Sequence, residues 1–216
     1  MSKPTKNFTD VLFSHWWQTL QPFSVDQIAA NQAFIQIVTA YSTPSRHYHT
    51  LKHIHHILVT IDTLQAYATD LPSVQLAAWF HDVVYDTQAK DNEERSADCA
   101  GEMLKSLEIP LSKINTVTSL ILQTKHHQPD DIDSQILLDA DLAILAANPV
   151  EYQEYANAIR QEYAWVSETD YIKGRQQVLE RFLQRQHIYS TPLMFKLAEQ
   201  SARSNIRAEI QMLNKK

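Results

Sequence analysis

The chain has 216 residues, 44% hydrophobic and 20% charged, so it is long enough to bury a core and has an ordinary globular composition. It holds only two glycines, Gly101 and Gly174, which argues against an all-β protein and excludes a glycine-rich phosphate-binding loop. A net charge of −6 is unlike the basic face of a nucleic-acid-binding protein, so we expect no nucleic-acid polymer as a partner. The single cysteine, Cys99, excludes an intramolecular disulfide and a cysteine-based zinc site.

Apolar residues recur at helical spacing along almost the whole chain. The spacing predicts helices over residues 8–20, 25–41, 49–68, 74–85, 92–107, 112–127 and 192–213. Asn148-Pro149 and Thr191-Pro192 each place a capping residue before a proline, which is typical of a helix start. We find no alternating strand pattern, internal repeat or linker. We therefore expect one all-α domain, residues 1–216, built as a bundle of about eight to ten helices.

The first residues, MSKPTKNFTDVLFSHWWQTL, lack the apolar core of a signal peptide. No stretch approaches the roughly 18 apolar residues of a membrane span. We therefore expect a cytoplasmic protein with no membrane partner. The four tryptophans are expected in the core rather than on a base-stacking platform: Trp16, Trp17, Trp79 and Trp165.

Histidine is frequent and unevenly spread, with ten residues in the chain. One ten-residue stretch holds His47, His49, His53, His55 and His56. Further along, His81 is followed directly by Asp82, and His126 is followed directly by His127. Imidazole nitrogen and carboxylate oxygen are ligands that divalent metals prefer. The pattern therefore indicates a metal site.

Two acidic segments lie within apolar, helix-forming sequence. Asp82 belongs to AAWFHDVVYD, where an unpaired buried carboxylate would be costly. A metal ion would compensate for it, and so would a salt bridge to a nearby Arg or Lys. Asp139 and Asp141 belong to LLDADLAIL and would point about 200° apart on a helix. Only one of them can face a given site, and the other should face solvent or a supporting partner.

A helical histidine, an adjacent His-Asp pair and a distant Asp together resemble the HD-domain superfamily of metal-dependent phosphohydrolases. Over roughly residues 40–190, several segments resemble predicted cytoplasmic HD phosphohydrolases of bacteria: SRHYHTLKH, AAWFHD, DNEERSA, LDADLAIL, IRQEY and YIKGRQQVLERFLQRQHIY. The resemblance implies an all-helical HD domain and a metal centre formed by His49, His81, Asp82 and Asp141.

The sequence does not identify the residue that acts as general acid or base, because it departs from the family pattern at one position. Some HD nucleotidases carry a catalytic glutamate three residues after the Asp of the pair, and this chain has Tyr85 there. The nearest acid, Asp86, would lie one helical turn from Asp82 and could reach the same pocket. Glu93 and Glu94 are further candidates, although Glu94 also suits a helix cap.

His53 lies one helical turn after His49, so both can face one site. It could hold a second metal, orient the phosphate, or simply be a hydrogen-bonded pocket histidine. Arg46 could clamp phosphate oxygens in bidentate fashion or form a structural salt bridge, and Arg175 is a weaker candidate for the same role.

The remaining histidines are weaker candidates. His126 resembles the extra histidine that some HD members use for a second metal. His47, His55 and His56 are expected at the surface.

The predicted chemistry is hydrolysis of a small phosphate ester, with a nucleotide among the candidates. A bound divalent ion (Mn, Mg, Fe, Co, Ni or Zn) would make its water more acidic, neutralise phosphate charge and orient the ester. Without it, repulsion between the carboxylates should raise at least one carboxyl pKa. A di-iron oxygenase is an alternative that needs both His53 and His126 as ligands. The other alternative is a module that binds a nucleotide without catalysing a reaction.

Overall fold

The computed structural model describes residues 7–215, and within them the chain is helical and has no β-strand. Its α-helices are α1 (Phe8–Leu20), α2 (Gln27–Tyr41), α3 (Leu51–Leu64), α4 (Leu71–Phe80), α5 (Asn92–Ser106), α6 (Leu111–Thr124), α7 (Ile132–Asp141), α8 (Pro149–Glu162), α9 (Glu168–Gln184) and α10 (Pro192–Leu213). Three short 3-10 helices continue α1, α3 and α7: η1 (Gln21–Phe23), η2 (Gln65–Tyr67) and η3 (Leu142–Ala146). The prediction of an all-α fold is confirmed for the described residues.

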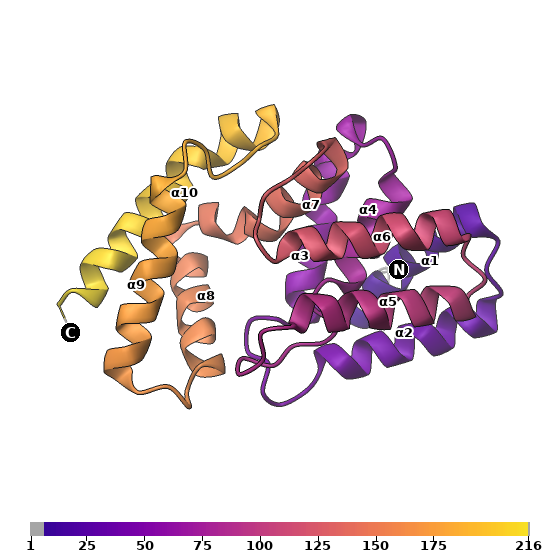
Figure 1. Cartoon of the computed structure of the whole chain (residues 1–216), viewed down its shortest axis with the longest axis horizontal. Coiled ribbons are helices and arrows are strands. Elements are labelled where there is room, and N and C mark those ends of the chain that lie inside the picture. Colours follow the sequence, from indigo (N-terminus) through magenta and orange to yellow (C-terminus); the bar gives the residue numbers. More distant parts are fainter. Residues whose placement is uncertain (1–6, 216) are drawn as a thin grey trace, which may run out of the picture.

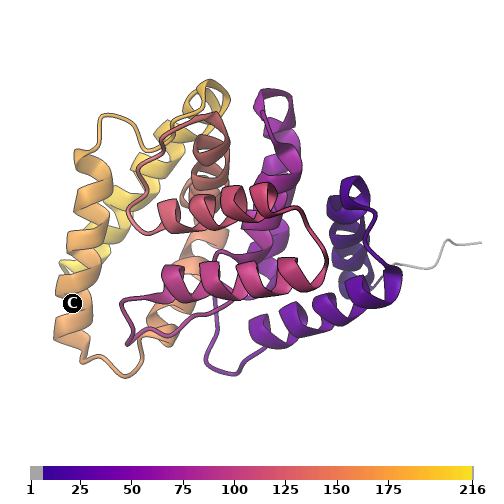
Figure 2. The same cartoon turned by 45° about the vertical axis from the view of Figure 1, so that its right-hand side comes forward.

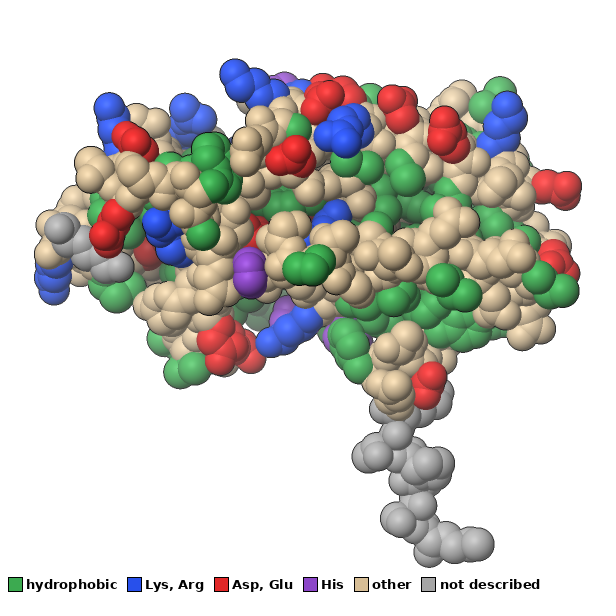
Figure 3. Space-filling view, turned by 90° about the horizontal axis from the view of Figure 1, so that it is seen from below, with side chains coloured by type: hydrophobic (Ala, Val, Ile, Leu, Met, Phe, Trp, Pro, Cys, Tyr) green, Lys and Arg blue, Asp and Glu red, His purple; other side chains and the backbone are tan. Residues whose placement is uncertain are grey.

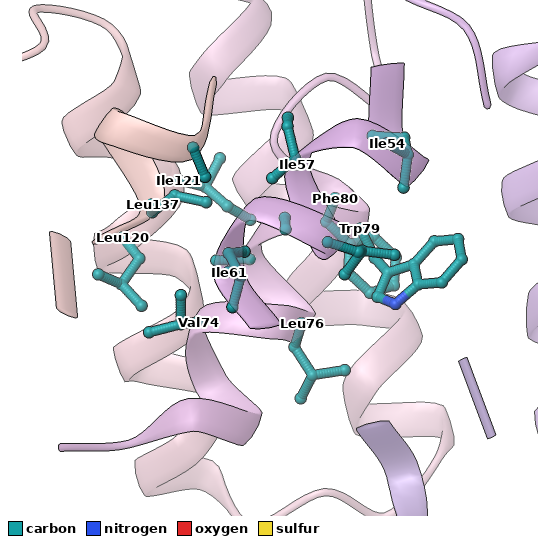
Figure 4. Close-up of a cluster of buried hydrophobic side chains, with 14 of the residues drawn as sticks. Ile54, Ile57, Ile61, Val74, Leu76, Trp79, Phe80, Leu120, Ile121 and Leu137 are labelled. Carbon is teal, nitrogen blue, oxygen red and sulfur yellow. The ribbon is translucent and has the colours of Figure 1, made fainter. Parts of the chain in front are cut away.

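The core is centred on α3, α4, α6 and α7, which pack together (Figure 4). Their inward-facing apolar side chains are almost completely buried: Ile54, Ile57, Ile61, Val74, Leu76, Trp79, Phe80, Leu120, Ile121 and Leu137. Each such side chain stabilises the fold by roughly 1.5–3 kcal/mol when it leaves water. Helices α3, α4 and α7 therefore form a fixed frame, and their ends carry the histidines and aspartates singled out above.

The C-terminal helices α8, α9 and α10 form one end of the molecule, and α1, α2, α5 and α6 lie toward the other (Figures 1 and 2). Helix α10 packs along η3 and α9, while α5 and α6 lie side by side. No helix within residues 7–215 is long and apolar enough to span a membrane.

The tryptophans divide between core and surface. Trp16 and Trp79 are fully buried and pack edge to face, with ring centroids 5.6 Å apart. Trp17 is partly buried against the core. Trp165 is 55% exposed, and its indole N–H donates to Thr87 Oγ1. The core prediction is therefore confirmed for Trp16 and Trp79 and wrong for Trp165.

The predicted helix starts at Asn148 and Thr191 are confirmed. The side chain of Asn148 accepts hydrogen bonds from two backbone N–H groups of the first turn of α8, and Thr191 Oγ1 accepts one from the first turn of α10. The predicted capping box at the start of α5 does not form. Asp91 makes no side-chain cap, and Glu94 pairs with Lys125 instead.

Two helices are shorter than predicted. Helix α3 begins at Leu51 rather than at residue 49, and Thr50 caps it. Helix α4 ends at Phe80 rather than at residue 85. It ends there because the next backbone N–H groups have other partners: that of Val83 donates to the carbonyl of Phe80, only three residues earlier, and that of Val84 donates to Ser96 Oγ. His81 and Asp82 therefore lie just beyond a helix end, not inside a helix.

Candidate metal centre

Three side chains from two helix ends meet at one point. His53 lies in the first turn of α3, and His81 and Asp82 follow α4. His81 Nε2 lies 3.3 Å from His53 Nε2 and 3.0 Å from Asp82 Oδ2. His53 Nε2 is 3.6 Å from the same Asp82 oxygen. These three residues form a group that could hold a metal ion.

Asp141, the last residue of α7, contacts both histidines of this group. Its Oδ1 atom lies 3.3 Å from His53 Nε2 and 3.6 Å from His81 Nε2. Neighbouring ligands of one ion at about 2.1 Å are about 3.0 Å apart in octahedral and about 3.4 Å in tetrahedral geometry. The observed separations of 3.0–3.6 Å are therefore close to those of atoms that share an ion.

A hydrogen bond on the side away from the cluster fixes the orientation of the His81 ring. Its Nδ1 donates to the carbonyl of Ala78 at 3.0 Å, because a carbonyl oxygen can only accept. That bond sets the tautomer, so the lone pair of neutral His81 is on Nε2, the atom that faces the cluster. Buried imidazole nitrogens and carboxylate oxygens are the donor set expected of a divalent metal site.

His49, predicted as a ligand, lies outside the tightest group. It precedes α3, and its Nε2 is 3.8 Å from Asp82 Oδ2. In the group that could hold a metal, the histidine from this segment is His53, one helical turn later. The reason is that α3 begins only after His49, whose Nδ1 donates at 2.7 Å to Glu162.

Glu162 holds the segment that carries His49. This carboxylate is the last residue of α8 and is 5% exposed. Its Oε1 accepts the backbone N–H groups of His47, Tyr48 and His49 at 2.8–2.9 Å. Its Oε2 accepts from His49 and from the hydroxyl of Tyr85. Nothing in the spacing of the sequence marks Glu162, because its partners lie 77 to 115 residues earlier in the chain.

Arg46 stabilises the backbone and does not line the cavity beside the cluster. It is 8% exposed, and its guanidinium donates to the carbonyls of His49, Asp82 and Val83 at 2.7–3.1 Å. The guanidinium also lies over the ring of Tyr41, 4.8 Å from its centroid. These contacts engage both terminal nitrogens of the guanidinium, and they favour a positioning role for Arg46 over the phosphate clamp.

Asp86 and Asp139, which lie close to Asp82 and Asp141 in the sequence, do not join the cluster. Asp86 is exposed in the loop after the His-Asp pair, and its carboxylate accepts the N–H of Gln88. It lies off the cavity because α4 ends before it, so the expected helical contact with Asp82 is absent. Asp139 points away from Asp141, as helical geometry predicts, and accepts hydrogen bonds from Ser190 and Thr191.

Two further acidic side chains lie on α5. Glu93 lines the cavity, and Glu94 pairs with Lys125.

The later histidine pair contacts the cluster through its second member. His127 Nε2 lies 3.1 Å from Asp141 Oδ2, whereas His126 is exposed. Of the histidines expected at the surface, His56 is exposed and His55 is partly buried. His47 is exposed.

Opposite charges dominate the electrostatics of the cluster. Burial alone would lower the pKa of His81, but Asp82 and Asp141 outweigh it and raise that pKa well above its usual value. Burial would also lower the pKa of His53, but Asp141 and Asp82 outweigh it and raise that pKa from its usual value. Burial opposes ionisation of Asp82 and Asp141, yet the surrounding histidines hold both carboxyl pKa values well below the usual range. The expected rise in a carboxyl pKa is therefore wrong, because the histidines compensate for the carboxylates.

The cluster opens onto a cavity of about 670 Å³. His49, His81, Asp82, His127 and Asp141 line one part of it. The rest is lined mainly by α8, α9 and the segment that joins them. This volume is typical of a site for a small molecule.

Comparison with known proteins assigns no family to this chain. No protein-family model, curated protein or solved structure matches it. Its likeness to HD phosphohydrolases therefore rests on the sequence motifs alone.

Proposed function

We propose that this protein binds a divalent metal through His53, His81, Asp82 and Asp141 and hydrolyses a small phosphate ester with it. The observation that carries the proposal is the convergence of these four side chains, from three helix ends, on one point beside a cavity of small-molecule size that His81, Asp82 and Asp141 line.

The donor set suits the proposed ion. Two imidazoles and two carboxylates match the preferences of Mn²⁺, Mg²⁺, Fe²⁺, Co²⁺, Ni²⁺ and Zn²⁺ without choosing among them. When bound, a divalent ion supplies Lewis-acid chemistry, which neutralises phosphate charge and makes water more acidic. The backbone contact of His81 presents its Nε2 to the ion, and the exposed edges of Asp82 and Asp141 face the cavity where the ester binds.

His49 is the proposed proton donor. Its ring lines the cavity, and Glu162 accepts the hydrogen bond from its Nδ1. A buried carboxylate behind an imidazole stabilises the protonated ring and fixes its direction. Burial opposes ionisation of Glu162, but the hydrogen bond from His49 outweighs it and lowers the pKa of Glu162 to about 2. The contact with Glu162 therefore fixes the His49 ring at the cavity wall, where its Nε2 is the proposed atom that passes a proton to the leaving oxygen of the ester.

The charges around the cavity favour a small ester as substrate. Lys125 and His127 line the same cavity, where both side chains can contact a bound phosphate, and His127 also contacts Asp141. On the face drawn in Figure 3, acidic and basic side chains are intermingled. A polymeric nucleic acid would call for a continuous basic surface.

A mononuclear hydrolase is favoured over the di-iron alternative. An oxygenase of that kind would need about six ligands, with His126 among them. His126 is exposed, and residues 7–215 contain one group of three or more suitable ligands. His127 contacts Asp141 but belongs to no second group of this kind.

The proposal is tested by phosphate release from a panel of small esters, with protein that has been chelated and then reloaded with Mn²⁺. We expect turnover only in the loaded state. The His49→Gln variant should keep its metal and lose about a hundredfold or more in turnover. Equal rates with and without metal would contradict metal-dependent hydrolysis. Metal-dependent nucleotide binding without turnover would instead favour the binding module.

A further inference from the structure

Gly174 lies in the middle of α9 on the cavity wall, where its backbone does not require glycine. Neither glycine of the chain has a positive φ angle. A Cβ atom built at residue 174 would meet no atom within 4 Å. Glycine destabilises a helix interior relative to alanine, so the conformation of α9 gives no reason for it. What the missing side chain does provide is room in the cavity.

The surroundings of this space are aromatic and aliphatic. Tyr171 and Val178 lie three residues before and four residues after Gly174, on the same face of α9. Tyr163 and Val166 come from the segment after α8, and the rings of Tyr163 and Tyr171 have centroids 6.5 Å apart. We call the part of the cavity lined by Gly174, Tyr171, Val178, Tyr163 and Val166 the Gly174 recess.

The polar groups beside the recess already have partners. Arg175 donates through Nε and one terminal nitrogen to Glu209, at 2.8 and 3.1 Å. Asp170 accepts a hydrogen bond from the hydroxyl of Ser167. A ligand with several hydroxyl groups would compete with these existing hydrogen bonds, which is unfavourable. An apolar ring makes no such demand, and tyrosine faces and edges attract aromatic rings.

We infer that the Gly174 recess binds a flat aromatic ring carried by the phosphate ester, so that aromatic esters are preferred to sugar phosphates and alkyl phosphates. The inference rests on the proposed function, because the phosphate group is placed at the metal centre. An aryl ester and the base of a nucleotide both present such a ring.

The first test fills the recess without touching the metal centre. Gly174→Leu should raise KM for phenyl phosphate by about tenfold or more, while KM for methyl phosphate changes little. Gly174→Ala should have a smaller effect in the same direction. Gly101→Ala is the matched control: residue 101 lies inside α5, and its new Cβ would meet side chains only at 3.8–4.0 Å. It should change neither KM.

The second test measures binding, so that it stands apart from turnover. Calorimetry on Mn²⁺-loaded protein should give tighter binding of phenylphosphonate than of methylphosphonate, by about tenfold or more, and Gly174→Leu should remove the difference. Adenosine monophosphate that binds tighter than phenylphosphonate would identify the ring as a base, and weaker binding would identify an aryl group.

The outcomes separate the two proposals. If no ester is hydrolysed but phenylphosphonate still binds in the recess, the proposed function fails and the recess assignment stands. If wild-type protein binds both phosphonates equally, or neither, the recess assignment is overturned whatever the turnover. It is also overturned if Gly174→Leu leaves the preference for the aromatic compounds unchanged.

Discussion

Two buried side chains outside the proposed ligand set hold the backbone around the candidate metal centre. Arg46 donates to the carbonyls of His49 and Asp82, and Glu162 accepts the backbone N–H of His49. Buried charges of this kind persist in folded proteins when hydrogen bonds satisfy them. Arg46 thus ties the turn after α4 to the turn before α3, and Glu162 ties the latter to α8. Both act on the ligands through the backbone.

Asp139 and Asp141 should have different functions. Asp141→Ala should weaken metal binding by more than about a hundredfold, because it removes a proposed ligand. Asp139→Ala should keep the metal and lower the free energy of unfolding by about 2–3 kcal/mol, because buried N–H and O–H donors near Thr191 lose their acceptor. Metal analysis and urea unfolding measure the two effects. Equal metal loss in both variants, with both folded, would contradict the assignment.

At the scale of elements, the centre is an assembly of helix ends. Helices α3, α4 and α7 contribute their termini, so that side chains from three elements meet at one point. Asp82 lies beyond α4, so its carboxylate avoids the apolar interior that the sequence pattern suggested. Arg46 holds the turn that follows α4, because its guanidinium donates to the carbonyl groups of Asp82 and Val83.

Removing this guanidinium should loosen the turn. Arg46→Met keeps much of the aliphatic length but leaves three carbonyl groups without their partner. We expect a loss of about 2–4 kcal/mol in the free energy of unfolding and weaker metal binding. Arg181→Met, on the exposed face of α9, is the control and should change stability by less than about 0.5 kcal/mol. Equal stability and metal affinity in both variants would contradict the positioning role.

The sequence predicts the elements better than it predicts their ends. Helical spacing gives the number of helices and the opposite directions of Asp139 and Asp141, because both follow from local geometry. It misses the ends of α3 and α4, because Thr50 caps α3 and Ser96 accepts the N–H of Val84, and both contacts lie outside the apolar pattern. The choice between His49 and its neighbour one turn later depends on those ends.

Glu162 illustrates what sequence spacing cannot supply. It meets His49 only through tertiary packing, and an acidic residue at the end of an amphipathic helix looks like a solvated one. Residue types and motifs therefore predict the metal-binding chemistry, and the three-dimensional contacts decide which histidine belongs to the cluster.

At the scale of the whole molecule, the cluster couples stability to pH and metal. The raised pKa values of His53 and His81 contribute stability to metal-free protein below about pH 6.5, which is lost as pH rises through their folded pKa. The lowered pKa values of Asp82 and Asp141 contribute stability above about pH 4, which is lost as pH falls through their folded pKa. For these groups, metal-free protein is most stable between those limits.

A bound metal should restore the stability that metal-free protein loses above neutral pH, because the ion binds neutral imidazole and competes with protons. We expect Mn²⁺ to raise Tm little at pH 5.5 and by about 8–16 °C at pH 8 when its concentration is about a thousand times Kd. Thermal unfolding with and without Mn²⁺ across this pH range measures the effect. A Tm increase that is larger at pH 5.5 than at pH 8 would contradict the linkage.

The central claim is that one metal ion is bound by the cluster that contains His53. The most direct measurement is the metal content of wild-type, His53→Ala and His49→Ala protein after loading with Mn²⁺ and removal of the excess. We predict about one equivalent in wild type and in His49→Ala, and almost none in folded His53→Ala. Loss of the metal in His49→Ala with retention in His53→Ala would contradict the account.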